Sequence, residues 1–364
     1  MTTPNRRLTR RDALKLGAAG SAGLAIAACG GAATAPTAAP AASAVPAAAA
    51  AVAGPSEALV RAAKAEGTLT WYVGVPPPAI PGLTKAFTDK YGINVVVNRQ
   101  NAATTAPLVK AEVEGGKVIG DIVTMSDSAI MKEFADKGWL TKPGEADMPS
   151  LKGWPAKFAY SAQGAHFMQA VGTYTIAYNK QLAGANVPKD WSALIDPRWK
   201  GKIILNNPKA TAGTWGFLMN LHRAYGPAFL QSLAKMDLKY GLSTTTDINS
   251  VASGDVAMLV PSSHWNNTDL IAKGAPIEDA YPNPPMGGAE QWGGVVKGAP
   301  HPNAALLFLD FSLSAAGQSA LCKDLCSSVI NAPGAMPLPA TYEPNNLIEA
   351  TARKNELLAL IGVQ

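Results

Sequence analysis

The pattern of hydrophobic and polar positions switches between strand-like and helix-like spacing along the first half of the folded region. Short runs rich in β-branched and aromatic residues, typical of buried strands, occupy 68–75, 93–97 and 121–125. Apolar residues recur at helical spacing over 83–90, over 108–114 and after Ser126 or Asp127, either of which would begin a helix as its N-cap. This alternation predicts an α/β fold with a mostly parallel sheet covered by helices on both faces.

A second unit of the same kind follows. Strand-like runs over 172–178, 202–205 and 255–260 alternate with helical patterns over 247–252 and from Thr211 or Thr214 to Tyr225. The remainder predicts a strand at 293–296 and helices at 303–313, around Gln318 and at 346–361. The folded region is therefore long enough for two α/β lobes.

Ligands of parallel α/β sheets bind beyond the carboxyl ends of the strands, where loops and helix N-termini present backbone amides. Applied to the predicted strands, this rule selects as ligand-binding candidates Gly74, Val75, Asn101, Ser126, Asp127, Thr211, Ala212, Gly213, Thr214, Trp215, Ser262, Ser263, His264 and Trp265. Tyr174, within the strand-like run 172–178, would face the same edge. An N-cap role is the simpler explanation of Asp127, although its carboxylate could also pair with an amine.

The small residues of Thr211–Thr214 form the best-defined of these candidate sites. At a helix start they leave several N–H donors open, and the helix dipole adds positive character that suits a carboxylate, phosphate or carbonate. Simple N-capping by Thr211 is the alternative. Trp215 could stack on a ligand or pack against a neighbouring helix.

The first 28 residues have the layout of an export signal. Arg6, Arg7, Arg10, Arg11 and Lys15 precede an uncharged run, 16–28, that is too short to span a membrane and ends at Cys29. The sequence 26–29 resembles a bacterial lipobox, so we expect lipid attachment at Cys29 and a protein tethered to a membrane outside the cytoplasm. The segment 9–15 resembles a twin-arginine signal, with Ala13 where Phe is usual.

The segment 29–56, made almost wholly of small residues and proline, carries no charge before Glu57 and cannot bury enough surface to fold. We expect a disordered tether. The leader has five basic residues and one Asp, so the formal net charge of +5 falls to about +1 without it. The remaining charge gives no support for nucleic-acid binding.

Cys322 and Cys326 are the cysteines that remain after lipidation. An exported protein can form a disulfide, but positions four apart on a regular helix are poorly placed to bridge, so the pairing stays open. No metal site or cofactor motif is expected, because the ligand spacings are missing. We also find no nucleophile elbow, zinc-protease motif or phosphate loop. Glu112 and Glu114 are predicted to lie on a solvated face of a helix.

Several blocks in order resemble the extracellular solute-binding proteins of ABC importers, in their ferric-iron-like branch. The blocks are 173–180, 187–203, Asn207-Pro208, 253–257 and 299–318. The resemblance implies a two-lobed clamp of the type II periplasmic-binding-protein kind, with lobe one at 57–168 plus 282–364 and lobe two at 169–281. Crossovers would lie near 168–172 and 277–282. A monomer would bind a small-molecule solute between its lobes and deliver it to an ABC permease, without being an enzyme.

The segment Ser262–Trp265 gives the most direct indication of the chemical identity of the solute. Ferric-binding relatives usually place adjacent tyrosines here, whereas this chain has two serines, His264 and Trp265. We therefore expect a small polar, anionic organic solute of carboxylate or phosphonate type. Ferric iron or another metal complex is the alternative, and an exported hydrolase a weaker one. His264 would donate to an anion or remain a structural residue, and His166, His222 and His301 are expected to be structural.

Overall fold

The computed structural model describes residues 54–144, 147–158, 164–209 and 211–363. The predicted export signal at 1–28, Cys29 and the tether up to residue 53 lie outside these residues. Ser56, at the end of the predicted tether, is the N-cap of the first helix, and its side chain accepts a hydrogen bond from the Leu59 amide.

The first of two five-stranded sheets has the strand order β2-β1-β3-β10-β4. Its strands are β1 (Thr68–Val73), β2 (Asn94–Arg99), β3 (Ile122–Met125), β4 (Phe167–Thr173) and β10 (Gly288–Val295). The first three are parallel, while β10 runs antiparallel to both of its neighbours. The predicted strand at 293–296 is therefore real but longer and antiparallel.

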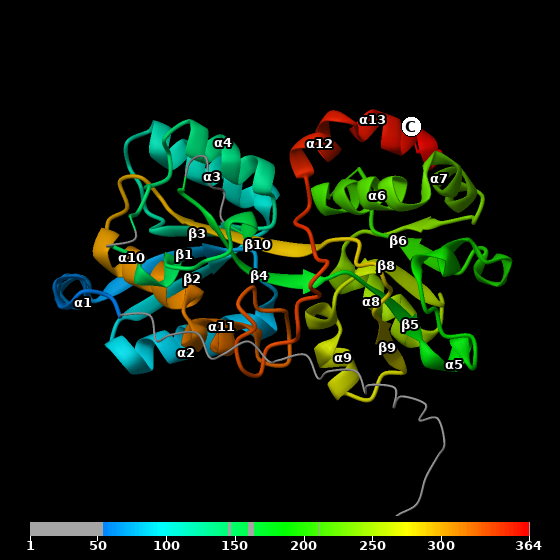
Figure 1. Cartoon of the computed structure of the whole chain (residues 1–364), viewed down its shortest axis with the longest axis horizontal. Helices are drawn as coiled ribbons and strands as arrows, with labels where there is room; N and C mark the ends of the chain where they lie inside the picture. The colour runs from blue at the N-terminus through cyan, green and yellow to red at the C-terminus, as the bar shows by residue number, and fades with distance from the viewer. Residues whose placement is uncertain (1–53, 145–146, 159–163, 210, 364) are drawn as a thin grey trace, which may run out of the picture. The chain divides into compact units, whose positions relative to one another are not determined.

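Helices cover both faces of this first sheet (Figure 1). One face carries α1 (Glu57–Glu66), α2 (Ile80–Tyr91), α10 (Pro302–Leu313) and α11 (Ala315–Cys322); the other carries α3 (Ala102–Glu114) and α4 (Ser128–Asp136). The apolar positions of α2 fall on one side, with Leu83 and Phe87 fully buried, and the ring of Phe87 packs edge-on against Phe308 of α10 at 5.0 Å. Helix α3 begins six residues earlier than predicted, because the Asn101 side chain caps it.

The second sheet has the order β7-β6-β8-β5-β9. Its strands are β5 (Thr175–Asn179), β6 (Ile203–Leu205), β7 (Lys239–Tyr240), β8 (Met258–Ser262) and β9 (Ile277–Ala280). One face carries α6 (Ala212–Tyr225), α7 (Pro227–Ala234), α12 (Leu347–Ala352) and α13 (Lys354–Leu360); the other carries α8 (Thr244–Ser253) and α9 (Thr268–Ala272). The short helix α5 (Lys180–Ala183) follows β5.

Changes of sheet mark where the chain passes between the two lobes. The predicted strand 172–178 is two strands, and the chain changes sheet at Tyr174 rather than at residue 168, because Phe167–Thr173 pairs with β10. A second passage lies between Ala280 and Gly288. A third was not predicted: α12 and α13 bury Ala350 and Leu357 in the core of lobe two, so the predicted assignment of 282–364 to lobe one is wrong after about Asn345.

Cys322 and Cys326 form a disulfide, with 4.6 Å between their Cα atoms. The pairing left open by the sequence is possible because α11 ends at Cys322 and Asp324 adopts a φ of 55°, which turns the chain back. Among the described residues no single helix is long and apolar enough to cross a membrane; α10 and α11 reach that length only together, and they meet at a 76° bend.

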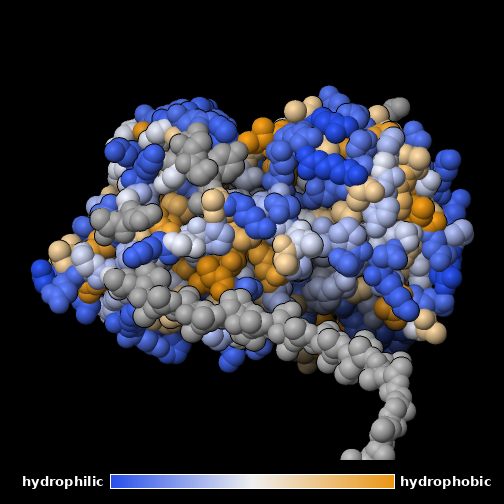
Figure 2. Space-filling view, viewed as in Figure 1, coloured by the Kyte–Doolittle hydropathy of each residue, from blue (hydrophilic) through white to orange (hydrophobic). Residues whose placement is uncertain are grey.

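Hydrophilic side chains cover the outer surface around α4 in the space-filling view, and hydrophobic groups are exposed toward the middle of the same face (Figure 2).

Candidate functional site

The carboxyl edge of the first sheet is closed by backbone contacts and helix caps. The Gly74 amide donates to the Thr124 carbonyl at 2.8 Å, and Val75 is fully buried. Asn101 caps α3, and the Asp127 carboxylate accepts from the amides of Ala129 and Ile130. Burial raises the pKa of Asp127, against the opposing effect of these two amides. The N-cap explanation of Asp127 is confirmed, and Ser126 is exposed beside it.

The start of α6 presents two backbone donors that have no acceptor within the described part of the chain. The Thr214 amide donates to the Thr211 carbonyl, and the hydroxyls of Thr211 and Thr214 lie 2.7 Å apart. Thr211 makes no side-chain cap, so the simple N-capping alternative is not observed. The amides of Ala212 and Gly213 find no acceptor among the described residues, and both residues are partly exposed. Because α6 has 14 residues, its dipole adds positive character at this point.

Tyr174 joins the first passage between the lobes to this helix start. Its hydroxyl donates to the Gly213 carbonyl at 3.3 Å, and a Cβ added at Gly213 would lie 2.8 Å from that hydroxyl oxygen. Burial, with the nearby Glu290, raises the pKa of Tyr174, so the phenol stays protonated. Glycine at 213 therefore allows the tyrosine to approach the exposed turn.

Trp215 has a structural environment. Its indole N–H donates to the Pro208 carbonyl, and the Lys354 ammonium of α13 lies 4.3 Å from the ring centroid. These contacts favour packing against a neighbouring helix over stacking on a ligand.

Ser262–Trp265 is mostly buried, contrary to the prediction that all four residues contact a ligand. Ser263 accepts from the side chains of Trp265 and Asn266, and Ser262 pairs with Asn267. Trp265 is 1% exposed and packs in the core of lobe one, where a Cβ at Gly172 would touch its ring at 2.6 Å. Val75 is likewise interior, so the predicted ligand contacts of Val75, Ser262, Ser263 and Trp265 are replaced by protein contacts.

His264 is the member of this segment that reaches the surface, with 27% of its side chain exposed. Its Nδ1 lies 2.9 Å from Oδ2 of Asp279, whose side chain is 3% exposed. The other oxygen of Asp279 accepts from the Thr175 hydroxyl at 2.8 Å and the Asn267 amide at 2.7 Å. Asp279 was not predicted, because a crossover between the lobes is expected at 277–282, whereas Ile277–Ala280 forms strand β9.

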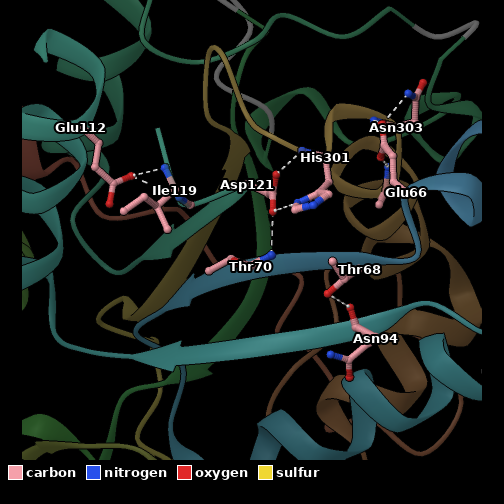
Figure 3. A network of polar contacts seen from close by, with 11 residues as sticks. Glu66, Thr68, Thr70, Asn94, Glu112, Ile119, Asp121, His301 and Asn303 are labelled. Carbon is pink, nitrogen blue, oxygen red and sulfur yellow. Dashed lines mark hydrogen bonds and ion pairs between the residues drawn. The ribbon is translucent and has the colours of Figure 1, made fainter. Parts of the chain in front are cut away.

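Lobe one contains a similar pair at the opposite edge of its sheet (Figure 3). Nδ1 of His301 lies 3.0 Å from Oδ2 of Asp121, which is fully buried and also accepts from the backbone amides of Thr70 and His301. Asp121 immediately precedes β3, so this pair lies at the amino ends of the strands. The structural role predicted for His301 is confirmed.

Two glutamates near this pair also bind backbone amides (Figure 3). Glu66 accepts from the amides of Asn303 and Ala304 at the start of α10. Glu112 accepts from the Ile119 and Gly120 amides and from the Tyr72 hydroxyl. The prediction that Glu112 lies on a solvated helix face is therefore wrong, because its carboxylate is needed to pair buried donors.

A further buried acid, Glu290 of β10, accepts hydrogen bonds from residues at the third passage of the chain between the lobes. It accepts from the Tyr342 hydroxyl at 2.7 Å, the Asn345 amide at 2.6 Å and the Trp292 indole at 3.1 Å. Burial raises the pKa of Glu290 to about 7, although these three donors oppose the rise. No sequence signal marked this residue, since two of its three partners, Tyr342 and Asn345, lie 52 and 55 positions away along the chain.

Two histidines remain, and His166 packs edge-on against Trp292, the indole donor to Glu290, with 5.8 Å between the ring centroids. His166 is fully buried, and burial lowers its pKa to about 4; His222 is on α6, near Glu356. One cavity of about 410 Å³ is lined by Asn355, Leu358, Ala359, Gly362 and Val363, and another of about 270 Å³ lies in the loop 186–199. Neither contains a predicted site residue. Within the described ranges, no three His, Cys, Asp or Glu side chains gather as a metal-binding set.

Comparison with known proteins relates residues 82–349 to a family described as "Bacterial extracellular solute-binding protein". An uncharacterized protein of Haemophilus influenzae is 26% identical over 305 residues, 80% of this chain and 86% of that protein. Iron-bound HitA from Pseudomonas aeruginosa superposes with a TM-score of 0.62 at 21% identity, covering 80% of this chain and 99% of HitA. AfuA from Actinobacillus pleuropneumoniae, with fructose-6-phosphate bound, superposes with a TM-score of 0.65 at 20% identity, covering 82% of this chain and 100% of AfuA. At these identities the two structures establish the fold.

Proposed function

The chain belongs to the bacterial extracellular solute-binding proteins, the non-enzymatic receptors of ABC importers, and we propose that its solute is a small organic anion of carboxylate or phosphonate type. The single observation that carries this proposal is the start of α6, where the amides of Ala212 and Gly213 lack acceptors among the described residues. A helix N-terminus with open amides binds anions through both hydrogen bonds and the helix dipole.

The position of this turn supports the proposal. It follows β6, whose neighbour in the sheet is β8, and the two strands are parallel. Their carboxyl ends therefore place the start of α6 and the partly exposed His264 on one edge of lobe two, the edge at which α/β proteins bind ligands. Tyr174 also reaches this edge through its hydrogen bond to Gly213.

Ferric iron or another metal complex is the second candidate, and the iron-bound neighbour HitA favours it. The other neighbour described above, AfuA, holds a phosphorylated sugar, which favours an organic anion. The local residues also favour the anion, because Ser262 and Ser263 occupy the segment in which the sequence resemblance leads us to expect tyrosine ligands. A metal could still reach this edge as part of an anionic complex.

We also propose that Cys29 carries a lipid, that the leader exports the chain by the twin-arginine route, and that a monomer works at the cell surface or in the periplasm. The basic leader and the lipobox-like sequence support this. Radiolabelled palmitate should be incorporated into the wild type and lost from Cys29→Ala, which should also be released from membranes. Labelling of Cys29→Ala at the wild-type level would contradict lipid attachment at this residue.

A thermal-shift screen with metal analysis tests the main proposal. A ligand that binds only the folded state stabilises it by about 2.7 kcal/mol at a hundredfold excess over Kd. We expect succinate, methylphosphonate or fructose 6-phosphate to raise Tm in a metal-free sample. Stabilisation by iron salts alone, with iron retained through purification, would favour the metal-binding alternative instead.

A further inference from the structure

His264 and Asp279 form an oriented pair at the edge of lobe two where the solute is proposed to bind. His264 begins a short 3-10 turn, His264–Asn266, separated from the end of β8 by one residue, and Asp279 lies on β9. The strand between them, β5, begins at Thr175, which is in register with Ser262 at the end of β8. Asp279, Thr175 and His264 therefore meet at the carboxyl end of β8.

The carboxylate of Asp279 is fixed on both of its oxygens. One accepts from Thr175 and Asn267, and the other faces Nδ1 of His264. A carboxylate only accepts hydrogen bonds, so the proton of the ring must sit on Nδ1. Nε2 is then the ring nitrogen available to a ligand, and it has no partner among the residues that the structure describes.

We propose that Asp279 is a positioning residue that holds the imidazole of His264 so that its Nε2–H, in the protonated ring, donates to the anionic solute. The inference rests on the proposed function and identifies a second contact of the same site. A neutral ring with its proton on Nδ1 would present a lone pair from Nε2, which repels an anion. Anion affinity should therefore fall as the ring loses its proton.

The ionisable groups around the ring show which acid acts on it. The turn that begins at His264 packs against α8, α9 and β4. The ionisable groups on these elements and on β9 are all acidic: Asp247 of α8, Asp269 of α9, and Glu278 and Asp279 of β9, with none on β4. Glu278 is engaged with Tyr178 and Lys180, so Asp279 is the acid in contact with the ring. No Lys or Arg on these elements competes for the solute.

The matched control is the pair in lobe one. His301 has the same carboxylate contact at Nδ1 and a similar exposure, 30%, but lies at the amino edge of its sheet. We would measure sulfate affinity at pH 6 and pH 8 by calorimetry for the wild type, His264→Gln, Asp279→Asn and His301→Gln. Sulfate is chosen because its own charge does not change over this range.

We expect the wild type to lose about tenfold in affinity from pH 6 to pH 8, the loss of one charge-assisted hydrogen bond. His264→Gln should bind about tenfold more weakly than the wild type at pH 6 and show little pH dependence, while His301→Gln should match the wild type. Asp279→Asn should also show little pH dependence, and at pH 8 it should bind sulfate more tightly than the wild type does. In Asp279→Asn, the single carbonyl oxygen is needed by Thr175 and Asn267, so the amide group faces Nδ1 and the neutral ring should carry its proton on Nε2. Ring ¹⁵N chemical shifts at pH 8 would report this exchange.

Wild-type affinity and pH dependence in His264→Gln would overturn the inference and leave the proposed function standing. An unchanged ring tautomer in Asp279→Asn would overturn the positioning role of Asp279. Failure of the wild type to bind sulfate, succinate or methylphosphonate would remove the proposed function, and the inference with it.

Discussion

Two Asp–His pairs, one in each lobe, use the same contact in different surroundings. Asp121 and His301 are 3.0 Å apart, and Asp279 and His264 are 2.9 Å apart. Asp121 also binds two backbone amides at the amino edge of its sheet, whereas the other partners of Asp279 are side chains at the carboxyl edge of its sheet. The two pairs differ in the edge of the sheet more than in residue type, and this is why we propose a ligand role only for the pair at the carboxyl edge.

The largest expected effect on stability comes from truncating the two acids. Asp121→Ala should lower the unfolding free energy by about 4 kcal/mol, because two partly buried backbone amides and the His301 ring lose their acceptor. Asp279→Ala should cost about 2 kcal/mol, since the Asn267 amide keeps its hydrogen bond to Ser262 and only the Thr175 hydroxyl and the His264 ring lose an acceptor. Urea denaturation of both variants measures the difference. Equal losses of unfolding free energy in the two variants would contradict the distinction between the two pairs.

Glu290 supplies a pH-dependent effect of similar size. Because its pKa is raised from 4.5 to about 7 in the folded state, the folded protein keeps a proton that the unfolded chain loses in this window. Stability should therefore fall by about 3 kcal/mol as pH rises from about 4.5 to about 7, and stay level above it. The difference between the wild type and Glu290→Gln across this range isolates the effect, because the opposite contribution of His166 is common to both. Parallel pH profiles would contradict it.

Gly213→Ala tests the edge of lobe two directly. The added methyl would lie 2.8 Å from the Tyr174 hydroxyl and beside the open amides, so the turn or the tyrosine must shift. We expect about a tenfold loss of anion affinity, about 1.4 kcal/mol, in calorimetry. Unfolding free energy should change by less than about 1 kcal/mol, because alanine favours the helix. Unchanged affinity would show that the open amides do not bind the solute.

Lys354→Ala should have the smallest effect. The cation–π contact with Trp215 is partly exposed, so its loss should lower the unfolding free energy by about 0.5 kcal/mol. Anion affinity should not change, because the indole is expected to be structural. A marked change in solute affinity on this substitution would indicate that Trp215 contacts the ligand.

The sequence predicted most of the architecture because its strands and helices have distinct periods and clear caps, as at Asp127 and Gly226. It also placed the start of α6 at the right turn. It missed Asp279 and Glu290, whose roles depend on partners distant in sequence, and it could not show that Trp265 would be buried in the other lobe. The third passage was missed because an amphipathic helix pattern does not say which sheet the helix covers.

Backbone amide NMR during a titration with succinate is the most direct test of the anion site. The account predicts that the amide resonances of Ala212 and Gly213 shift strongly and saturate, while those of Thr70 and His301 at the opposite edge stay in place. Saturating binding that leaves Ala212 and Gly213 unmoved would contradict it.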